Sequence, residues 1–584
     1  MKRKTMAEFN LITEEWIPCV MCGDSSGEIK PKSLREAFAE ADQIEEIIGE
    51  NPLVTISLYR LLIAILHDCL QGPKDYDEWG KWWSDETFDT QKLNEYFSQN
   101  EKNFHLFDDE KPFYQTSKVE FDEKFLKPIW KFFLEGEHYT TLFEHTNTGK
   151  SHTLTAAQTA RYLLAFQNFD VGGLQTYVHE KGMTQVEISN VKSADASLLN
   201  KCAVALVKGE NLFKTLMLNL TQYDCKFGIP FPKREIADSP VWRNDREINP
   251  KEDSKPVGYV DLLTWQSRRI RLKQKTELSK AVVGEVVVMK GNQISELSSL
   301  YGKEQMACFR KSPTKGWTSI SFQREKFLWR DSLSLFQSVE EKSARPQILD
   351  WLNDLISNGK LPSDAIFPLE FFGLCVNKAK PLFWRHERLP LPVIYLNNQK
   401  LCDELGEALK LAEIIAGLLS GGVYRMATLH FLPDTRFEIA DWFRPALSRD
   451  LRQKAKDSFD KLKKSKDYKK KFNDVDDLSK SLAPELRYWS RLETPFRHLL
   501  LALAVNLDDW KNERQKWAKV LQKTALLAFD EVAFSLGNSP RSLRSTSVAR
   551  NWLEVELRIK RKRYANFEAI DDEVEKQEEE EVEE

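Results

Sequence analysis

The strongest constraint on the fold is a change of pattern after Pro390-Leu391-Pro392, where apolar residues begin to recur at helical spacing. In each of four runs, the apolar side chains fall on one face of a helix. The runs cover residues 401–419, 486–503, 510–524 and 548–559. We expect the first helix to end at Gly421-Gly422. Four long amphipathic helices in succession predict a four-helix bundle.

A lysine-rich stretch lies between the first two of these runs. Lys454–Lys471 holds nine lysines against three aspartates. We expect this stretch to form the end of a helix and a connecting loop, with its lysines solvated. Contact with nucleic acid is the alternative, because a cluster of cations attracts phosphates.

The first 395 residues combine helix and strand patterns. Residues 52–70 repeat apolar side chains at helical spacing, and the run AVVGEVVVM at 281–289 is typical of a strand. Lys290-Gly291-Asn292 follows as a candidate turn. Because proline and glycine are spread through this part without a repeat, we expect one large irregular domain. The predicted fold is α+β, with a mixed domain over 1–395, a four-helix bundle over 396–567 and an acidic tail over 568–584.

The composition favours a soluble globular protein in a reducing cytoplasm. Hydrophobic residues make up 41% of the 584 residues and charged residues 30%, and the eight cysteines are mostly scattered, as free thiols would be. We find no apolar run near 18 residues and no secretion signal, and therefore expect no membrane association. The net charge of −4 combines a tail, Asp571–Glu584, at −9 with a body at +5. Such a tail is predicted to be disordered; it keeps the protein soluble or masks a basic surface.

In Pro256–Leu272 an aromatic and aliphatic run passes directly into cations. Arg268, Arg269 and Arg271 follow the apolar anchors, and two lysines come next. An anchored strip of this kind predicts guanidinium groups presented to phosphates. The alternative is a surface strand whose arginines are only solvated.

Three fragments imitate catalytic or metal-binding motifs. Thr148-Gly149-Lys150-Ser151 lacks the earlier glycine and the buried strand of a phosphate-binding loop. His67-Asp68 resembles the core of a metal-dependent phosphohydrolase, but it lies in an amphipathic helix and further ligands are missing. Cys19 and Cys22 lack the two additional ligands that zinc requires. We therefore expect a binding protein, with no catalytic residues, no metal and no cofactor.

Five motifs carry a resemblance that runs in a consistent order from about residue 9 to residue 560. They are FNLITEEWIP at 9–18, KPFYQT at 111–116, PVGYVDLLTWQSRRIRL at 256–272, FLWRD at 327–331 and ELRYW at 485–489. Together they resemble the Cse1/CasA (Cas8e-type) family, which supplies the large subunit of the type I-E CRISPR surveillance complex, Cascade. A mixed domain followed by a helical bundle is also the architecture of that family.

The resemblance implies a non-catalytic, DNA-binding role. Such subunits recognise a short protospacer-adjacent motif (PAM) on double-stranded DNA, open the duplex beside it, so that an R-loop forms, and help to recruit a helicase–nuclease. The guide RNA reads the target itself by base pairing. The expected partners are the other Cascade subunits, the CRISPR RNA, double-stranded target DNA and the helicase–nuclease. Two alternatives remain, a metal-dependent nuclease around His67-Asp68 and a scaffold whose bundle only holds neighbouring subunits.

The resemblance also implies individual site residues. Asn377-Lys378-Ala379 matches a wedge that enters the duplex, with lysine where the family often has glutamine. Gly172-Gly173 matches a glycine-rich loop near the minor groove, and Lys290 is our placement of a lysine finger in that groove. Phe143-Glu144-His145 matches a loop that reaches toward the RNA 5′ handle and a neighbouring subunit. An ordinary turn, solvated lysines and a surface loop are the alternatives. Because the minor groove mainly distinguishes A·T from G·C pairs, we expect a short, tolerant motif.

Overall fold

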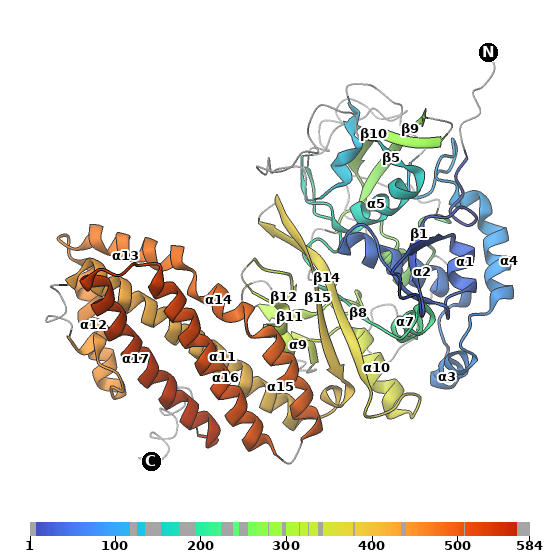
Figure 1. Ribbon diagram of the computed structural model, residues 1–584. Coiled ribbons are helices and arrows are strands. Elements are labelled where there is room, and N and C mark those ends of the chain that lie inside the picture. The colour runs from blue at the N-terminus through green and yellow to red at the C-terminus, as the bar shows by residue number, and fades with distance from the viewer. Residues whose placement is uncertain are drawn as a thin grey trace. The chain divides into compact units, whose positions relative to one another are not determined.

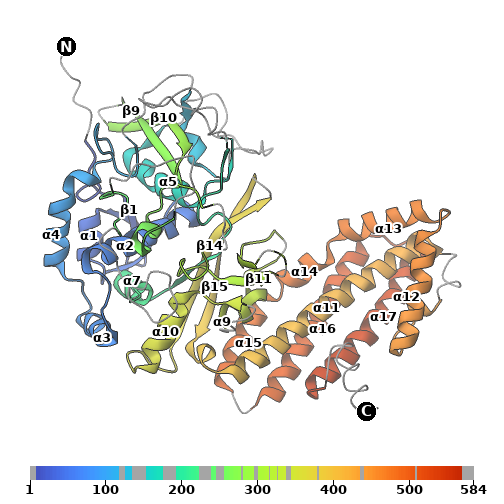
Figure 2. The same cartoon turned by 180° about the vertical axis from the view of Figure 1, so that it is seen from behind.

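The computed structural model in Figures 1 and 2 describes residues 8–568 except for short internal segments. The segments outside the described residues are 117–124, 135–152, 175–192, 223–237, 245–254, 278–279, 295–299, 313, 315, 325, 337–342, 378–379, 434–439 and 507–508. The chain divides into two compact units. A mixed unit comprises Met1–Arg324 and Ser334–Asn397, and a helical unit comprises Glu325–Leu333 and Asn398–Glu584.

The mixed unit combines helices with small antiparallel sheets, which agrees with the predicted α+β class. Its helices are α1 (Leu34–Ala39), α2 (Pro52–Leu70), α3 (Tyr76–Asp85), α4 (Thr90–Asn100), α5 (Ala156–Phe169), α7 (Leu212–Asn219), α8 (Tyr259–Leu263) and α10 (Gln347–Ser357). One sheet has the order β2-β1-β3, formed by Ile29–Lys32, Ile17–Met21 and Ile44–Ile47. Another has the order β12-β11-β13, formed by Gly316–Ser319, Phe309–Ser312 and Ser343–Ala344.

Helix α2 forms the centre of the mixed unit, and its predicted range of 52–70 is confirmed. The Asn51 side chain accepts hydrogen bonds from the backbone N–H groups of Leu53 and Val54, both at 3.0 Å, and Pro52 occupies the first turn. The length and apolar character of α2 would also suit a membrane span, contrary to the expectation of no such run. However, 83% of the apolar window is buried inside the protein, which is typical of a core helix.

A four-stranded sheet carries the arginine-rich segment. Strand β10 (Lys280–Lys290) pairs with β4 (Lys127–Pro128), β5 (Leu154–Thr155) and β9 (Arg268–Glu277). The strand predicted at 281–289 is confirmed, and it is one residue longer at each end. Nearly continuous burial along β10 explains its valine-rich pattern, because Val286, Val287 and Val288 are all fully buried.

The longest strands of the mixed unit form a hairpin that extends as a yellow ribbon in Figure 1. Strand β14 (Ile366–Asn377) pairs with β15 (Lys380–Pro392) on one edge and with β8 (Val204–Val207) on the other. The last register pair before the tip joins Asn377 to Lys380, and both residues are exposed. The described ends of both strands, next to the connecting residues, are therefore exposed to solvent.

The helical unit contains the predicted bundle. Its helices are α11 (Gln399–Phe431), α12 (Arg449–Lys464), α13 (Lys469–Leu482), α14 (Pro484–Ser490), α15 (Glu493–Val505), α16 (Trp510–Phe534) and α17 (Pro540–Ala565). Helices α11, α16 and α17 pack against one another, and α14 and α15 pack in succession along α16, so together they make four bundle positions. The second predicted helix, 486–503, is thus divided between α14 and α15.

Helix α11 continues through Gly421-Gly422, so the prediction that these glycines end the helix is wrong. A Cβ atom on Gly422 would lie 3.4 Å from Leu553 Cβ of α17 and 3.6 Å from the Phe529 ring of α16. The missing side chains let three helices approach closely. Packing of the apolar faces therefore outweighs the roughly 1 kcal/mol helix penalty of each glycine.

The lysine-rich stretch also differs from its prediction, because most of it is helical. It forms the end of α12 and the start of α13, with a break at residues 465–468. Phe459 and Phe472 are buried in a small core with Val475 and with Ala427 of α11. These sparse apolar residues anchor the helix pair, while most of its lysines remain exposed.

A short segment from the middle of the chain, Glu325–Leu333, belongs to the helical unit. The Trp329 ring stacks on Phe496 of α15 at a centroid distance of 4.4 Å and meets Trp489 of α14 edge-on at 5.6 Å. The Arg330 guanidinium lies 3.8 Å from the Trp489 ring centroid and bonds to Glu413 of α11. This segment ends where the short helix α9 (Ser332–Phe336) begins.

Candidate functional site

The Gly172-Gly173 turn follows α5 and begins strand β6 (Gly173–Leu174), which pairs with β7 (Ser193–Ala194). Gly173 has φ +142°, a conformation that residues with a Cβ atom rarely adopt, and open space surrounds the position of its missing Cβ. A Cβ on Gly172 would lie 2.9 Å from the carbonyl oxygen of Ala194 and from the backbone nitrogen of Ala196. Both positions therefore require glycine, one for its conformation and the other for space.

The side chain of Arg268 bonds to residues on both sides of this turn. Its side chain is fully buried, and Nε bonds to Asp170 Oδ2 at 2.6 Å. Its Nη2 donates to the carbonyl oxygens of Val171, at 3.2 Å, and of Asp195, at 2.8 Å. One guanidinium group thus joins the residue that precedes the glycine turn to the chain that follows β7. Such a planar, fork-shaped donor fixes both distance and direction.

The backbone of Arg268 is fixed as well. The amide of Gln167, in the last turns of α5, donates to the Arg268 carbonyl at 2.8 Å and accepts from the Arg268 N–H at 2.9 Å. Gln167 is 1% exposed, so this two-way bridge is protected from water. These two hydrogen bonds therefore join helix α5 to strand β9 a few residues before the glycine turn.

Lys290 lies opposite Arg268 in the β9–β10 register, at the end of β10. Beyond it, the Gly291 N–H donates to Ser267 O at 3.2 Å, and a Cβ on Gly291 would lie 2.5 Å from the Gln266 carbonyl oxygen. The Gln293 side chain accepts a hydrogen bond from the N–H of Asp195, the residue that follows β7. This bond links the chain beyond Lys290 to the strand that pairs with the glycine turn. The structure therefore brings together Gly172-Gly173 and Lys290, which are over a hundred residues apart in sequence.

The expected strip of phosphate-binding arginines is not presented to solvent, which corrects that prediction. Arg268 is committed to Asp170 and to backbone carbonyls. Arg269 is 6% exposed, and burial lowers the pKa of its guanidinium to about 10. Arg271 donates to the Asp108 carbonyl at 3.0 Å, and burial lowers its pKa too. The pattern of apolar anchors followed by arginines marks a buried clamp here, because the partners come from distant parts of the chain.

Other predicted site residues lie outside the described residues. Lys378 and Ala379 of the wedge are in this group, with Asn377 as the last described residue before them. Phe143, Glu144 and His145, and the phosphate-loop imitation at 148–151, also lie outside the described residues.

His67-Asp68 has the surroundings of a packing site. The His67 ring is fully buried and meets the Tyr259 ring edge-on at a centroid distance of 5.1 Å. Asp68 accepts a hydrogen bond from the Tyr96 hydroxyl at 2.8 Å and pairs with Arg243. Among the described residues, no group of three or more His, Cys, Asp or Glu side chains could hold a metal ion. The geometry gives the metal-dependent alternative no support.

The lone cysteine pair is divided between two environments. Cys19 is buried, and desolvation raises the pKa of its thiol to about 12. Cys22 is exposed at the end of the same strand region. A thiol that is held protonated is a poor metal ligand and a poor nucleophile.

A hollow of about 620 Å³ lies between the β14–β15 hairpin and the start of α2. Its charges compensate one another, because Glu370 bonds to His386 Nε2 at 3.2 Å and pairs with Arg388, and Lys208 pairs with Glu46. Burial opposes ionisation of Glu370, but these neighbours hold its pKa below the ordinary value. No sequence pattern indicated this network, since its members come from strands far apart in the chain.

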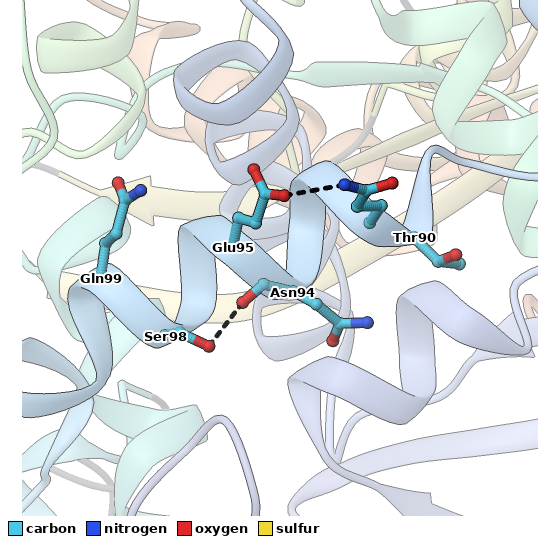
Figure 3. Close-up of a pocket in the computed structure, with 6 residues that line it drawn as sticks. Thr90, Asn94, Glu95, Ser98 and Gln99 are labelled. Atoms are coloured by element: carbon cyan, nitrogen blue, oxygen red, sulfur yellow. Dashed lines mark hydrogen bonds between the residues drawn. The ribbon is translucent and has the colours of Figure 1, made fainter.

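A second hollow lies along helix α4 (Figure 3). Its six lining residues all belong to that single helix, spaced along residues 90–99. They bond mainly among themselves, as Gln91 Nε2 does to Glu95 Oε1 at 3.0 Å and Ser98 Oγ to the Asn94 carbonyl at 2.8 Å. This hollow is the solvated face of one helix, and it does not form a binding site.

Comparison with known proteins identifies the family. Residues 10–528 match the family model of the CRISPR-associated protein Cse1. The CasA/Cse1 protein of Thermus thermophilus is 26% identical over 437 residues, which cover 71% of this chain and 80% of that protein. The crystal structure of Thermobifida fusca Cse1 has a TM-score of 0.73 at 22% identity, over 96% of this chain and 99% of that one. A chain of a CRISPR RNA-guided surveillance complex shares the fold, with a TM-score of 0.66 at 17% identity, over 94% of this chain and 99% of that one. The chain belongs to the Cse1 family of CRISPR-associated proteins.

Proposed function

We propose that this protein is a non-catalytic subunit of a cytoplasmic CRISPR RNA-guided surveillance complex. In this role it recognises a PAM in double-stranded DNA and promotes opening of the duplex beside it. Membership of the Cse1 family supports the first part, because a chain of the same fold occurs in a CRISPR RNA-guided surveillance complex. The second part rests on the geometry around Arg268.

The observation that carries the proposal is the rigid pairing of a glycine turn with Lys290. A turn without Cβ atoms allows the backbone to approach the floor of the minor groove, which is only about 6 Å wide. A lysine beside it supplies a long cationic side chain that can follow the backbone into the groove. Because the Arg268 clamp fixes the backbone of the turn and of the β9–β10 strand end together, the free-energy cost of ordering both groups in the same groove is reduced.

The remaining parts of the proposal come from the family resemblance. Asn377, Lys378 and Ala379, which join β14 to β15, act as the wedge, whose long side chain pushes between base pairs. Phe143, Glu144 and His145 approach the RNA 5′ handle and a neighbouring subunit. The assembled complex then recruits a helicase–nuclease, which cuts the DNA.

The test uses the complete complex with its guide RNA. We expect Lys290→Ala to weaken binding to a duplex target about tenfold, while binding to the complementary single strand is unchanged. Lys280→Ala is the matched control, because Lys280 is an exposed lysine at the other end of the same strand. A library of randomised flanking base pairs then shows whether the lost affinity is specific to the motif.

Two results would overturn this proposal. Equal loss on duplex and single strand after Lys290→Ala would indicate general phosphate binding. Normal assembly and unaltered duplex binding after both Lys290→Ala and Lys378→Ala would indicate a scaffold.

A further inference from the structure

One face of the helical unit carries cations without matching carboxylates. Helices α16 and α17 lie side by side here, because Arg561 Nη1 donates to Gln522 Oε1 at 2.6 Å. Around this contact, four exposed cations lie on adjacent turns of the two helices. They are Lys519, Lys523, Arg558 and Lys562, and we call them the basic face.

Acidic residues are missing from this part of both helices. On α16 no aspartate or glutamate occurs between Glu513 and Asp530, and on α17 none occurs between Glu556 and Glu568. Glu556 itself is buried and is engaged by the Ala446 N–H at 2.8 Å and by Arg452. Within the described part of the chain, none of the four cations of the basic face has a carboxylate within ion-pair distance. Their mutual repulsion is therefore uncompensated.

The opposite charge follows directly in the chain. Asp571–Glu584 carries ten acidic residues and one lysine. It starts within a few residues of Ala565, where α17 ends. Fourteen residues in extended form reach at most about 50 Å, whereas Arg558 lies only about 10 Å back along the helix from Ala565. The segment is therefore several times longer than the distance it must span to reach the basic face.

We propose that residues 571–584 lie on the basic face and occupy it in competition with other polyanions. The contact is electrostatic and intramolecular, so its strength depends on ionic strength and on the short connection. As a consequence, residues 571–584 reduce the binding of nucleic-acid phosphates to α16 and α17 at low salt.

The lysines of α12 and α13 are a less favourable partner for this segment. The Arg514 guanidinium donates to the Tyr564 carbonyl and pairs with Glu404, which places the end of α17 beside the first turns of α11. Lys463 of α12 bonds instead to the Tyr424 hydroxyl. Tyr424 is twenty residues beyond Glu404 on α11, a rise of about 30 Å. Reaching those lysines would stretch the segment and cost more chain entropy.

The test is proteolysis of the full chain with a Glu-specific endoprotease. The cleavage rate within 571–584 is measured at low ionic strength and at about 0.5 M salt. A free peptide of the same sequence serves as the reference for effects on the protease. We expect the protein to be cleaved about fivefold more slowly than the peptide at low salt, and equally fast at high salt.

Charge variants identify the surface. Lys519→Gln/Lys523→Gln/Lys562→Gln should raise the low-salt cleavage rate toward that of the free peptide. Lys454→Gln/Lys456→Gln/Lys461→Gln removes the same charge from α12 and should leave the rate unchanged. Faster cleavage in the second variant instead of the first, or equal rates for protein and peptide at low salt, would overturn the proposal.

A second measurement keeps the inference testable if the triple variant does not fold. In the full chain, the ten acids of the segment are exchanged for their amides, and binding to a random-sequence DNA duplex is measured. We expect a severalfold gain in affinity at low salt that disappears at about 0.5 M salt. No gain would mean that the segment does not cover a phosphate-binding surface, and the proposal would fail.

Discussion

Arg268 of the mixed unit and Arg425 of the helical unit are both buried arginines, yet they are held in different ways. Arg268 bonds to a carboxylate and to carbonyl groups on two chain segments. Arg425 lies between two indole rings, with its guanidinium 3.9 Å from the Trp442 centroid and 3.6 Å from the Trp552 centroid. Hydrogen bonds fix direction, whereas aromatic faces mainly fix separation. Arg268 therefore determines the geometry of a loop, and Arg425 determines how closely helices pack.

The largest expected effect is that of Arg268→Ala. Removal of this guanidinium leaves Asp170 buried without its charge partner, so we expect the free energy of unfolding of the mixed unit to fall by about 3–5 kcal/mol. Denaturant unfolding measures the change, and Arg310→Ala, an exposed arginine of strand β11, serves as control with a change within about 0.5 kcal/mol. The double variant Arg268→Leu/Asp170→Leu should recover much of the loss. A cost below about 1 kcal/mol for Arg268→Ala would contradict the clamp.

Arg425→Leu should cost less, about 1–2 kcal/mol. The variant loses two cation–π contacts and two hydrogen bonds, from Nε to the Trp442 carbonyl at 2.8 Å and from Nη1 to the Gly421 carbonyl at 3.2 Å. It also removes a buried charge, and burial already lowers the pKa of that guanidinium, so part of the loss is recovered. Arg444→Leu is the control, because Arg444 is exposed. If Arg425→Leu lowered the free energy of unfolding as much as Arg268→Ala, the distinction between an arginine held by hydrogen bonds and one held between aromatic rings would not hold.

The smallest expected effect on stability is that of Glu370, a second carboxylate of the mixed unit that is paired with cations. Its pKa lies below the ordinary 4.5 in the folded protein, since His386, Lys208 and Arg388 outweigh the effect of burial. A lowered folded pKa stabilises the protein above the unfolded pKa, and this stabilisation disappears as the pH falls through the folded value. Compared with Glu370→Gln, the protein should therefore be more stable near pH 6, with the difference shrinking below about pH 4.5. A difference that grows on acidification would reverse the assignment.

Local patterns predicted the elements well, because helix and strand periodicity is a property of neighbouring residues. The range of α2 and the core of β10 agree with their predictions, and the apolar faces at 510–524 and 548–559 lie within α16 and α17. Gly421-Gly422 was misjudged because its effect depends on Leu553 and Phe529, which no local pattern reveals. The same limit explains why only the family resemblance, and no local pattern, associated Gly172-Gly173 with Lys290.

The clamp itself could not be predicted, since its partners are distant in the chain. Asp170 lies 98 residues before Arg268, and the contacts through Gln167 and Asp195 are similarly remote. From the sequence, the arginines following an apolar anchor appeared as ligands for phosphate. In the folded protein they support the turn that we propose to enter the groove.

The position of Trp329 has a consequence for how this chain can be divided. Because Glu325–Leu333 belongs to the helical unit, the polypeptide passes between the two units three times, and a single cut near Asn397 would not release either of them. A fragment that starts at Asn398 would leave the rings of Phe496 and Trp489 without their cover. The helical unit is therefore compact, but it is built from two separate stretches of the chain. To isolate it, the nine-residue stretch Glu325–Leu333 would have to be added as a peptide or joined through a new linker.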